Sequence, residues 1–563
     1  MKRTLGLATA VALSLSVAGG AAMASPNPNA NPNASKPRPV PEGRLADVQL
    51  LHFSDFHGHL QPNGEYGGAA YLSGLISQLR GQAADTSYTL NSGDNIGGST
   101  FLSGLFQDEP TIEVLNAIGL DAAAVGNHEL DEGKKEFARI INGGNHPELG
   151  QMGPEPYTGT KFPYLSANLV DSTTKKPLLP PYVIQKTRGV EVGIIGITTS
   201  DLPELVSPAG IAGITVLPEA ETINRYAAEL QRKGVQSIVV LMHEGGNANA
   251  YPSPITAGST NGCDNLTGKI VDINKAVSPA VDVFLTGHTH RAFTCELPDP
   301  KGVNRTITGP GDWGRVLTEV NLRIDRQTKD VVRSRTSAVN HVVTTSGPAD
   351  ARVQSIVDRW QKGADVVARE VIGSAAEAIT GDASGDRGVE TAMGNLVADA
   401  ILAGTSSDGA QISLMNIGGV RASLDAGDIT YEEAYAVLPF GNRLVTLDMT
   451  GAQLEEVLNQ QYNASRSRTM LALSVSEGFT YTWDASANRV VSGSMALNGQ
   501  PIEAGTTYKV STLNFLADGG DGFTAFTEAS ARVGGPEDLS AFISYIRANS
   551  PVASPGADRV TGL

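Results

Sequence analysis

"AAAVGNHELD", residues 122–131, joins a run of small apolar residues directly to side chains that bind metals or transfer protons. The run from Ala122 to Val125 is typical of a short buried strand. Asn127, His128 and Asp131 follow it almost at once. Ligands of α/β sheets bind beyond the carboxyl ends of the strands, so this order of residues favours a strand that ends at a functional site.

The same succession, an apolar run followed by side chains that can bind metals, occurs at four other places between residues 47 and 331. Short apolar runs alternate there with helical patterns, which predicts an α/β domain whose strand ends converge. Two pairs of residues are spaced i, i+2, so both side chains of each pair point the same way from an extended segment. The residues at these four strand ends are Asp55 and His57, Asp94, His243, and His288 and His290.

Metal ions are the simplest partners for these side chains. A buried carboxylate costs several kcal/mol unless positive charge compensates it, and no Lys or Arg adjoins Asp55 or Asp94 in the sequence. His and Asp are good ligands for Zn, Mn or Fe, and the candidates exceed what one tetrahedral ion needs. Each of these motifs alone is typical of a solvated loop or a buried histidine. Their occurrence together in one domain favours two metal ions that share a carboxylate. We expect His52 to be structural and His59 to flank the site.

Length and charge set limits on the kind of protein. A chain of 563 residues exceeds the size at which a single core stops growing, so two or more domains are expected. The 42 Lys and Arg against 59 Asp and Glu give a formal charge of −17. Binding to a nucleic-acid polymer or to an anionic membrane requires clustered positive charge, so neither is expected as a general property. No oligomeric state is predicted.

The N-terminus has the pattern of a secretory signal peptide. Lys2 and Arg3 precede an apolar stretch, and Ala22-Met23-Ala24 is a small-residue cleavage site, so residues 1–24 are expected to be removed. The apolar core is shorter than the roughly 20 residues of a membrane span, which makes an uncleaved anchor the less favoured alternative. The mature protein is therefore expected to be secreted or periplasmic, without a stable membrane anchor.

The remaining organisation follows from composition. Residues 25–44 are rich in Pro and Asn and are predicted to be a disordered linker. A first domain is predicted at 45–340, an exposed inter-domain helix at 348–370, and a second domain at 371–550 that opens with a helix over 390–404. Cys263 and Cys295 are the only cysteines, and in an exported protein an even pair favours one disulfide over two free thiols.

The combination of motifs resembles a known family. Asp55-x-His57, Gly93-Asp94, "GNHELD", His243 and "GHTH" at 287–290 resemble the calcineurin-like metallophosphoesterases. "MGNLVADA", "NIGGVR", "VLPFGN" and "NFLADGGDGF" resemble the C-terminal domain of the 5′-nucleotidases, a family that also includes UDP-sugar hydrolases. The resemblance covers nearly all of the mature chain. It implies an α/β/β/α sandwich followed by a smaller α+β domain.

The resemblance also implies roles for individual residues. Two divalent ions, Zn, Mn or similar, are expected in the first domain, with His128 facing the phosphoryl group and Asp131 orienting its ring. At the position of His290 some nucleotidases carry an amide residue, which leaves the preferred metal open. The implied ligands are Asp55, His57 and His290 for one ion, Asn127, His243 and His288 for the other, and Asp94 as the bridge. The implied substrate contacts are Arg387, Asn416, Arg421, Phe440, Phe515 and Asp521.

Together with the signal-peptide pattern, the resemblance implies an exported 5′-nucleotidase of nucleotide catabolism that removes the phosphate by metal-activated water. The same metal site also serves UDP-sugars, nucleoside di- and triphosphates and cyclic nucleotides, which stay open as alternative substrates. A secreted nucleotide-binding protein with a structural metal site is the remote alternative. His128 and Asp131 argue against it, because a closed structural site has no use for them. Read without the resemblance, Phe440 and Phe515 are ordinary core aromatics.

Overall fold

The computed structural model describes residues 40–563, with gaps at 84–85, 148, 207–209, 249–254, 465 and 467. The predicted signal peptide and residues 25–39 of the predicted linker lie outside the described residues. The first described element is a 3-10 helix, η1 (Glu42–Arg44), and the first strand begins directly after it.

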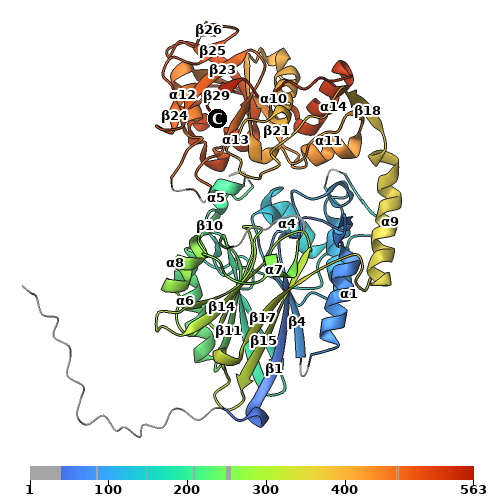
Figure 1. The fold of residues 1–563 in the computed structure, drawn as a ribbon, viewed down its shortest axis with the longest axis vertical. Coiled ribbons are helices and arrows are strands. Elements are labelled where there is room, and N and C mark those ends of the chain that lie inside the picture. Colours follow the sequence, from blue (N-terminus) through green and yellow to red (C-terminus); the bar gives the residue numbers. More distant parts are fainter. Residues whose placement is uncertain are drawn as a thin grey trace, which may run out of the picture. The chain divides into compact units, whose positions relative to one another are not determined.

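The first lobe is built on two mixed sheets that lie face to face (Figure 1). One sheet has the order β16-β15-β1-β4-β5-β6, with β17 beside β15, and the other has the order β13-β14-β12-β11-β9-β8. The strands of the first sheet are β1 (Leu45–Phe53), β4 (Thr86–Asn91), β5 (Ala122–Ala124), β6 (Tyr164–Leu165), β15 (Val316–Asp325), β16 (Asp330–Val331) and β17 (Ser337–Val342). Those of the second are β8 (Tyr182–Thr187), β9 (Val190–Thr198), β11 (Ser237–His243), β12 (Val283–Thr286), β13 (Ala292–Pro298) and β14 (Asn304–Pro310).

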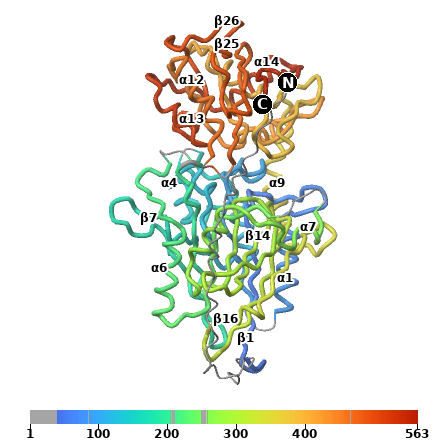
Figure 2. Tube along the Cα trace, turned by 60° about the vertical axis from the view of Figure 1, so that its left-hand side comes forward, coloured from blue at the N-terminus to red at the C-terminus, as the bar shows by residue number. Residues whose placement is uncertain are grey.

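Both faces of each sheet are buried, and alternating residues divide between them. In β1, Val48 and Leu50 join the core between the sheets, while Leu51 and Phe53 face the helices of the first sheet. Figures 1 and 2 show α1 and α6 on opposite sides of the two sheets. The helices are α1 (Ala69–Arg80), α3 (Glu109–Ile118) and α4 (Gly133–Asn142) on the first sheet, and α6 (Glu219–Arg232) and α8 (Lys269–Ala276) on the second. The predicted α/β/β/α sandwich is confirmed.

The central strands of each sheet are parallel. In the first sheet β1, β4, β5 and β6 run in one direction, and in the second β9, β11, β12 and β14 do so. Parallel strands end at one edge of a sheet, so the segments after β1, β4 and β5 meet one another, as do those after β11 and β12.

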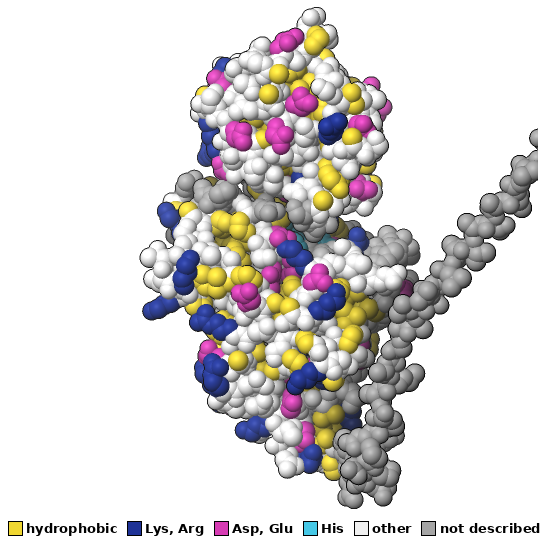
Figure 3. Space-filling model, turned by 90° about the vertical axis from the view of Figure 1, so that its left-hand side faces the viewer, with side chains coloured by type: hydrophobic (Ala, Val, Ile, Leu, Met, Phe, Trp, Pro, Cys, Tyr) yellow, Lys and Arg dark blue, Asp and Glu magenta, His cyan; other side chains and the backbone are white. Residues whose placement is uncertain are grey.

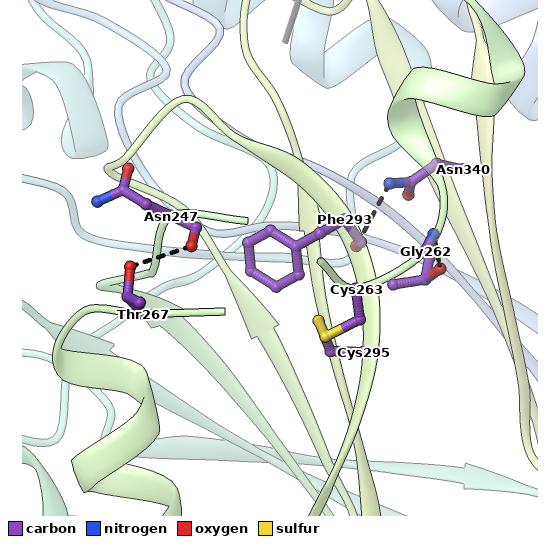
Figure 4. The surroundings of a disulfide bond; sticks show 8 residues. Asn247, Gly262, Cys263, Thr267, Phe293, Cys295 and Asn340 are labelled. Atoms are coloured by element: carbon purple, nitrogen blue, oxygen red, sulfur yellow. Dashed lines mark hydrogen bonds between the residues drawn. A yellow bond between two sulfur atoms is a disulfide. The ribbon is translucent and has the colours of Figure 1, made fainter. Parts of the chain in front are cut away.

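Cys263 and Cys295 form a disulfide, as expected from their number (Figure 4). Cys295 lies in β13, the strand that follows the "GHTH" segment, and Cys263 lies in the loop after α7 (Ala257–Thr260). The backbone of Thr294, next to Cys295, also donates to the carbonyl of Gly262 at 3.0 Å. The bridge and this hydrogen bond hold the two segments side by side.

A helix, α9 (Ala351–Ala368), leads out of the first lobe, within the range predicted for an inter-domain helix. Asp350 caps its start by accepting hydrogen bonds from the backbone amides of Arg352 and Val353. The prediction of an exposed helix is wrong for one of its faces, because Val353 and Trp360, with three other apolar side chains of α9, are buried against the first lobe. Its apolar residues at helical spacing form a stripe that requires this packing.

The second lobe begins at β18 and is of the α+β type, as predicted. Its elements continue to Thr561, beyond the predicted boundary at 550, because β29 pairs with β23. One of its sheets pairs β18 (Val371–Ala375) with β20 (Gly427–Thr430). A second has the order β22 (Leu473–Val475), β19 (Ile412–Asn416), β27 (Thr507–Leu513), β21 (Arg443–Thr450) and β28 (Arg532–Glu537). The third contains β24 (Arg489–Val490), β23 (Phe479–Asp484), β25 (Ala496–Leu497), β26 (Gln500–Pro501) and β29 (Val560–Thr561). Its longer helices are α10 (Ala392–Gly404), α11 (Tyr431–Val437), α12 (Gly451–Asn459) and α14 (Asp538–Asn549).

Short elements complete the chain. They are β2 (Pro62–Asn63), β3 (Tyr66–Gly67), β7 (Leu169–Asp171), β10 (Ile214–Val216), α2 (Phe101–Gly104), α5 (Leu202–Leu205) and α13 (Asn514–Ala517). Within the described part of the chain, none of the helices combines the length and the apolar character that crossing a bilayer demands. Figure 3 shows Lys and Arg interspersed with Asp and Glu on the face turned to the viewer.

Candidate metal centre and active site

The segments that follow the parallel strands carry the candidate ligands on a left-handed backbone. Five of these residues have positive φ although none is glycine: Asp55, His57, Asp94, His288 and His290. Asp and His tolerate this region better than most residues, yet each such position costs free energy and persists only where the surroundings fix it. Backbone hydrogen bonds supply that support, since Asp55 and His57 donate to the carbonyls of Gly93 and Asp94, both at 3.0 Å.

One group of ligand atoms comes from the segments that follow β1 and β12. Single atoms of Asp55, His57 and His290 all lie within 4.8 Å of one another. Asp55 is fully buried, and its carboxylate also accepts from the backbone amide of His288 at 2.9 Å. The loops after β1 and β12, which belong to different sheets, are therefore joined at this carboxylate.

A second group combines the ends of β4, β5, β11 and β12. Asp94, His243 and His288 each place one ligand atom within the same 4.8 Å. Asn127 joins them, because its Oδ1 lies 3.2 Å from Nε2 of His243. Asp94 also belongs to a cluster with His57 and His128, so it lies between the two groups. All seven predicted ligands thus lie close together, with Asp94 between the two groups.

Close approach of the backbones makes this convergence possible. A Cβ atom at Gly126 would lie 2.0 Å from Oδ1 of Asp94, so only glycine fits between the ends of β4 and β5. The glycine of the sequence "GN" in the opening motif is therefore required for a steric reason.

The polar atoms of this site fit divalent ions. Nε2 of His57 is buried without a hydrogen-bond partner among the described residues. Its Nδ1 donates to the carbonyl of Gly97 at 2.7 Å, which leaves the lone pair on the unpartnered Nε2. Likewise Nδ1 of His243 donates to the carbonyl of Ser92 at 2.8 Å, and its Nε2 faces the oxygens of Asp94 and Asn127 at 3.1 and 3.2 Å. Positive charge is needed between these atoms, either as a proton on Nε2 of His243 or as a divalent ion bound to its lone pair.

The electrostatics agree with that requirement. Burial holds the pKa of His57 and that of His288 well below the usual value, so both rings are neutral and available as ligands at pH 7. Burial also acts to lower the pKa of His243, but the charge of Asp94 overrides it and raises this pKa to about 10. The site around Asp94 therefore gains from added positive charge.

His128 and Asp131 form a hydrogen-bonded pair beside the two groups. His128 begins a short 3-10 helix, η2 (His128–Leu130), that places Asp131 one turn later. Nδ1 of His128 lies 2.7 Å from the Asp131 carboxylate, and its backbone amide donates to Asp94 at 2.9 Å. Burial lowers the pKa of His128, while the carboxylate of Asp131 reverses the shift and raises this pKa above its usual value.

Two further carboxylates of the site were not predicted. Glu129 lies within the opening motif, and its carboxylate accepts hydrogen bonds from the backbone amides of Asp94 and Asn95 in the loop after β4. Asp312 contacts the ring of His290 from the loop between β14 and β15. The motif made Glu129 discoverable, whereas no pattern connects Asp312 with His290, 22 positions earlier.

The predicted substrate residues all lie in the second lobe, with Asn416 at the end of β19, Phe515 in α13 and the others in loops or a 3-10 turn. Nδ2 of Asn416 donates to Asp521 at 2.8 Å, and Oδ1 of Asn416 is buried without a hydrogen-bond partner among the described residues. The guanidinium of Arg387 lies against Gly418, in the same "NIGGVR" segment. That of Arg421 lies 5.6 Å from the centre of the Phe440 ring.

The two predicted base-binding rings have different surroundings. The Phe440 ring is parallel to that of His128, with centroids 5.9 Å apart. The Phe515 ring packs against Gly520, where an added Cβ would lie 2.5 Å from a ring carbon. Both rings are partly exposed, which a base-stacking role requires.

Comparison with known proteins gives consistent matches. The calcineurin-like phosphoesterase family matches residues 48–292, and the 5′-nucleotidase C-terminal domain matches residues 371–528. Endonuclease YhcR of Bacillus subtilis is 32% identical over 534 residues, which are 91% of this chain and 41% of that protein. Cell wall protein Lmo0130 of Listeria monocytogenes is 31% identical over 535 residues, 89% of this chain and 67% of that protein. The chain thus spans less than half of the endonuclease and about two thirds of the cell wall protein.

A solved structure has a similar fold over nearly the whole chain. The 5′-nucleotidase precursor of Thermus thermophilus superposes with a TM-score of 0.74 at 26% identity, and the match covers 92% of this chain and 99% of that one.

Proposed function

The chain belongs to the calcineurin-like phosphoesterases that carry a 5′-nucleotidase C-terminal domain, and on this basis we propose that it is an exported 5′-nucleotidase. The observation that supports this proposal best is the juxtaposition of the ligand groups with the His128–Asp131 pair. A structural metal site would need the ligands alone, whereas phosphate-ester hydrolysis also needs a group that stabilises or protonates oxygen.

Two divalent ions would be held by the residues already described. Asp55, His57 and His290 would bind one, Asn127, His243 and His288 would bind the other, and Asp94 would contact both. The chemistry that such ions supply when bound is activation of water and neutralisation of charge on phosphoryl oxygens. The buried, neutral rings of His57 and His288 suit this role without any proton release.

His128 would act on the phosphoryl group or on the leaving alcohol. Its Nδ1 donates to Asp131, so this carboxylate fixes the ring and stabilises its protonated form. The other ring nitrogen is then available to donate a hydrogen bond or a proton to an oxygen that gains charge in the transition state.

The second lobe would hold the nucleoside. Phe440 and Phe515 would stack on the base, and stacking of this kind contributes about 1–3 kcal/mol per base with any base. Asp521 would accept from the ribose hydroxyls, with its orientation fixed by Asn416. Arg387 and Arg421 would bind the anionic part of the substrate through guanidinium forks. A broad tolerance for the base follows from these contacts.

Cleavage of a phosphodiester is the second candidate function, because the relative with 32% identity is named an endonuclease. UDP-sugars, nucleoside di- and triphosphates and cyclic nucleotides use the same metal chemistry and fall in the same group of alternatives. Export is supported by the match to a cell wall protein and by the signal-peptide pattern of residues 1–24.

A substrate panel separates these candidates. Metal-loaded protein would be given 5′-AMP, 3′-AMP, ADP, UDP-glucose, 2′,3′-cyclic AMP and a single-stranded oligonucleotide at equal concentration. The proposal expects the highest kcat/KM with 5′-AMP. A clear preference for UDP-glucose, a cyclic nucleotide or the oligonucleotide would retain the metal site and reject the 5′-nucleotidase. Failure of every phosphate ester to react would favour a protein that only binds nucleotides.

A further inference from the structure

Asp312 is a buried carboxylate whose two oxygens have different partners. It lies in the loop between β14 and β15 with 5% of its surface exposed. Its Oδ2 lies 3.1 Å from Nδ1 of His290. Its Oδ1 accepts from Nε of Arg315 at 3.1 Å and also from a terminal nitrogen of that guanidinium. The carboxylate is therefore fixed on one side by Arg315 and presents its free oxygen to His290.

This contact determines which nitrogen of His290 can bind a metal. A ring nitrogen that faces a carboxylate oxygen carries the proton, so the lone pair of the neutral ring lies on Nε2. Nε2 is the atom on the side of the ligand group, 3.5 Å from Oδ1 of Asp55.

The loop that carries Asp312 is itself held in place at the ligand group. The backbone amide of Trp313 donates to the carbonyl of Asp55 at 2.8 Å, so one loop supports two of the three ligands. Trp313 has a φ of 56°, which is rare for a bulky residue. Its ring stacks on His59 at a centroid distance of 4.5 Å, and the guanidinium of Arg315 lies 4.5 Å from the same ring. These contacts compensate the strained backbone.

We propose that Asp312, fixed by Arg315, is a positioning residue that orients His290 for metal binding and strengthens the site formed by Asp55, His57 and His290. The inference rests on the proposed function, since it needs two ions at separate sites. His57 and His243 donate instead to the neutral carbonyls of Gly97 and Ser92. The negative charge of Asp312 therefore acts more strongly on the site formed by Asp55, His57 and His290 than on the site formed by Asn127, His243 and His288. Loss of such a partner typically weakens metal binding 10- to 100-fold.

The variant Asp312→Asn tests this role with little change of shape. An amide has a single oxygen, so it cannot accept from Arg315 and from His290 at once. If the oxygen stays with Arg315, the amide nitrogen donates to Nδ1 of His290, and the ring proton moves to Nε2, where it blocks the ligand atom. Arg315→Gln keeps the carboxylate but removes part of its support, so a smaller effect on the same site is expected.

Asp282→Asn is the matched control. Asp282 is also a buried aspartate that pairs with an arginine, Arg333, at 2.9 Å. It directly precedes β12, at the end of the strand opposite to His288, so its loss affects stability without touching a ligand. Melting curves of all variants establish that each one is folded before metal is added.

The measurement is calorimetric titration of chelator-treated protein with Mn²⁺, fitted to two sites. Wild type and Asp282→Asn are expected to bind two ions with the same affinities. Asp312→Asn is expected to bind one ion 10- to 100-fold more weakly and the other unchanged, and Arg315→Gln to weaken the same site by less. Two sites of wild-type affinity in Asp312→Asn, or equal weakening of both, would overturn the inference. A wild-type protein that binds fewer than two ions would overturn the two-ion proposal itself and this inference with it.

Discussion

Glu129 connects the ends of two strands through backbone hydrogen bonds. Its Oε2 accepts from the amides of Gly126 at 2.6 Å and Asp94 at 2.9 Å, and its Oε1 accepts from the amide of Asn95 at 2.8 Å. The side chain is buried, and the Tyr164 hydroxyl approaches Oε1 at 3.4 Å. The carboxylate thus holds the loop after β4 against the loop after β5, where Asp94 and Asn127 lie.

Replacing Glu129 by Gln should destabilise the protein by about 1.5–4.5 kcal/mol. The amide keeps one oxygen, which can still accept from Gly126 and Asp94. Its nitrogen then replaces the oxygen that accepts from the backbone amide of Asn95, so two N–H donors face each other in a buried position. Burial raises the pKa of Glu129 to about 7, so the lost hydrogen bond contributes the ordinary value of about 0.5–1.5 kcal/mol, and a buried unsatisfied donor costs about 1–3 kcal/mol. Loss of the bond and of its acceptor together gives the expected range.

The assay is urea unfolding of chelator-treated protein, so that metal binding does not contribute to the difference. Glu65→Gln serves as the control, because Glu65 is an exposed carboxylate of the same lobe, and such surface changes usually stay within about 0.5 kcal/mol. A Glu129→Gln variant as stable as this control would refute the reasoning, since the three amides would then not depend on the carboxylate.

Three further perturbations address catalysis, the disulfide and the substrate. The carboxylate of Asp131 raises the pKa of His128, which burial alone would lower. Asp131→Asn should therefore lower this pKa and move the alkaline limb of the plot of kcat against pH to lower pH; an unmoved limb would contradict the pairing of His128 with Asp131. Replacing both Cys263 and Cys295 by Ser opens a loop with a sequence separation of 32, so urea unfolding should show a free energy of unfolding lower by about 3–4 kcal/mol. A decrease of less than about 1 kcal/mol would show that the disulfide is dispensable for stability. Phe440→Ala should raise KM for 5′-AMP roughly 5- to 150-fold, from the loss of about 1–3 kcal/mol of stacking, but leave KM for ribose 5-phosphate unchanged; equal changes would exclude stacking on the base.

The fold and the ligand groups could be predicted because their signals are local. Each apolar run is followed within a few residues by its ligands, and parallel strands necessarily bring their ends to one edge. The alternation along β1, with Val48 facing the second sheet and Phe53 facing helices, follows from the strand period. The buried face of α9 was missed, although its apolar residues occur at helical spacing.

The supporting carboxylates could not be predicted because the residues that they contact lie far from them in the sequence. Asp312 reaches His290 only after the chain has passed through β13 and back through β14. Its partner Arg315 and the stacked Trp313 are ordinary turn residues in the sequence. Glu129 is part of the motif, but its role depends on the amides of Asp94 and Asn95, which belong to another loop.

We infer above all that this protein hydrolyses a nucleotide in a metal-dependent reaction with His128 as a catalytic residue. The most direct test is phosphate release from 5′-AMP by chelator-treated protein, before and after addition of Mn²⁺ or Zn²⁺, beside His128→Ala treated in the same way. We expect release only after metal is restored, a rate reduced about 10²- to 10⁴-fold in His128→Ala, and unchanged metal binding in that variant. Release that persists without metal, or a variant with full activity, would contradict the claim.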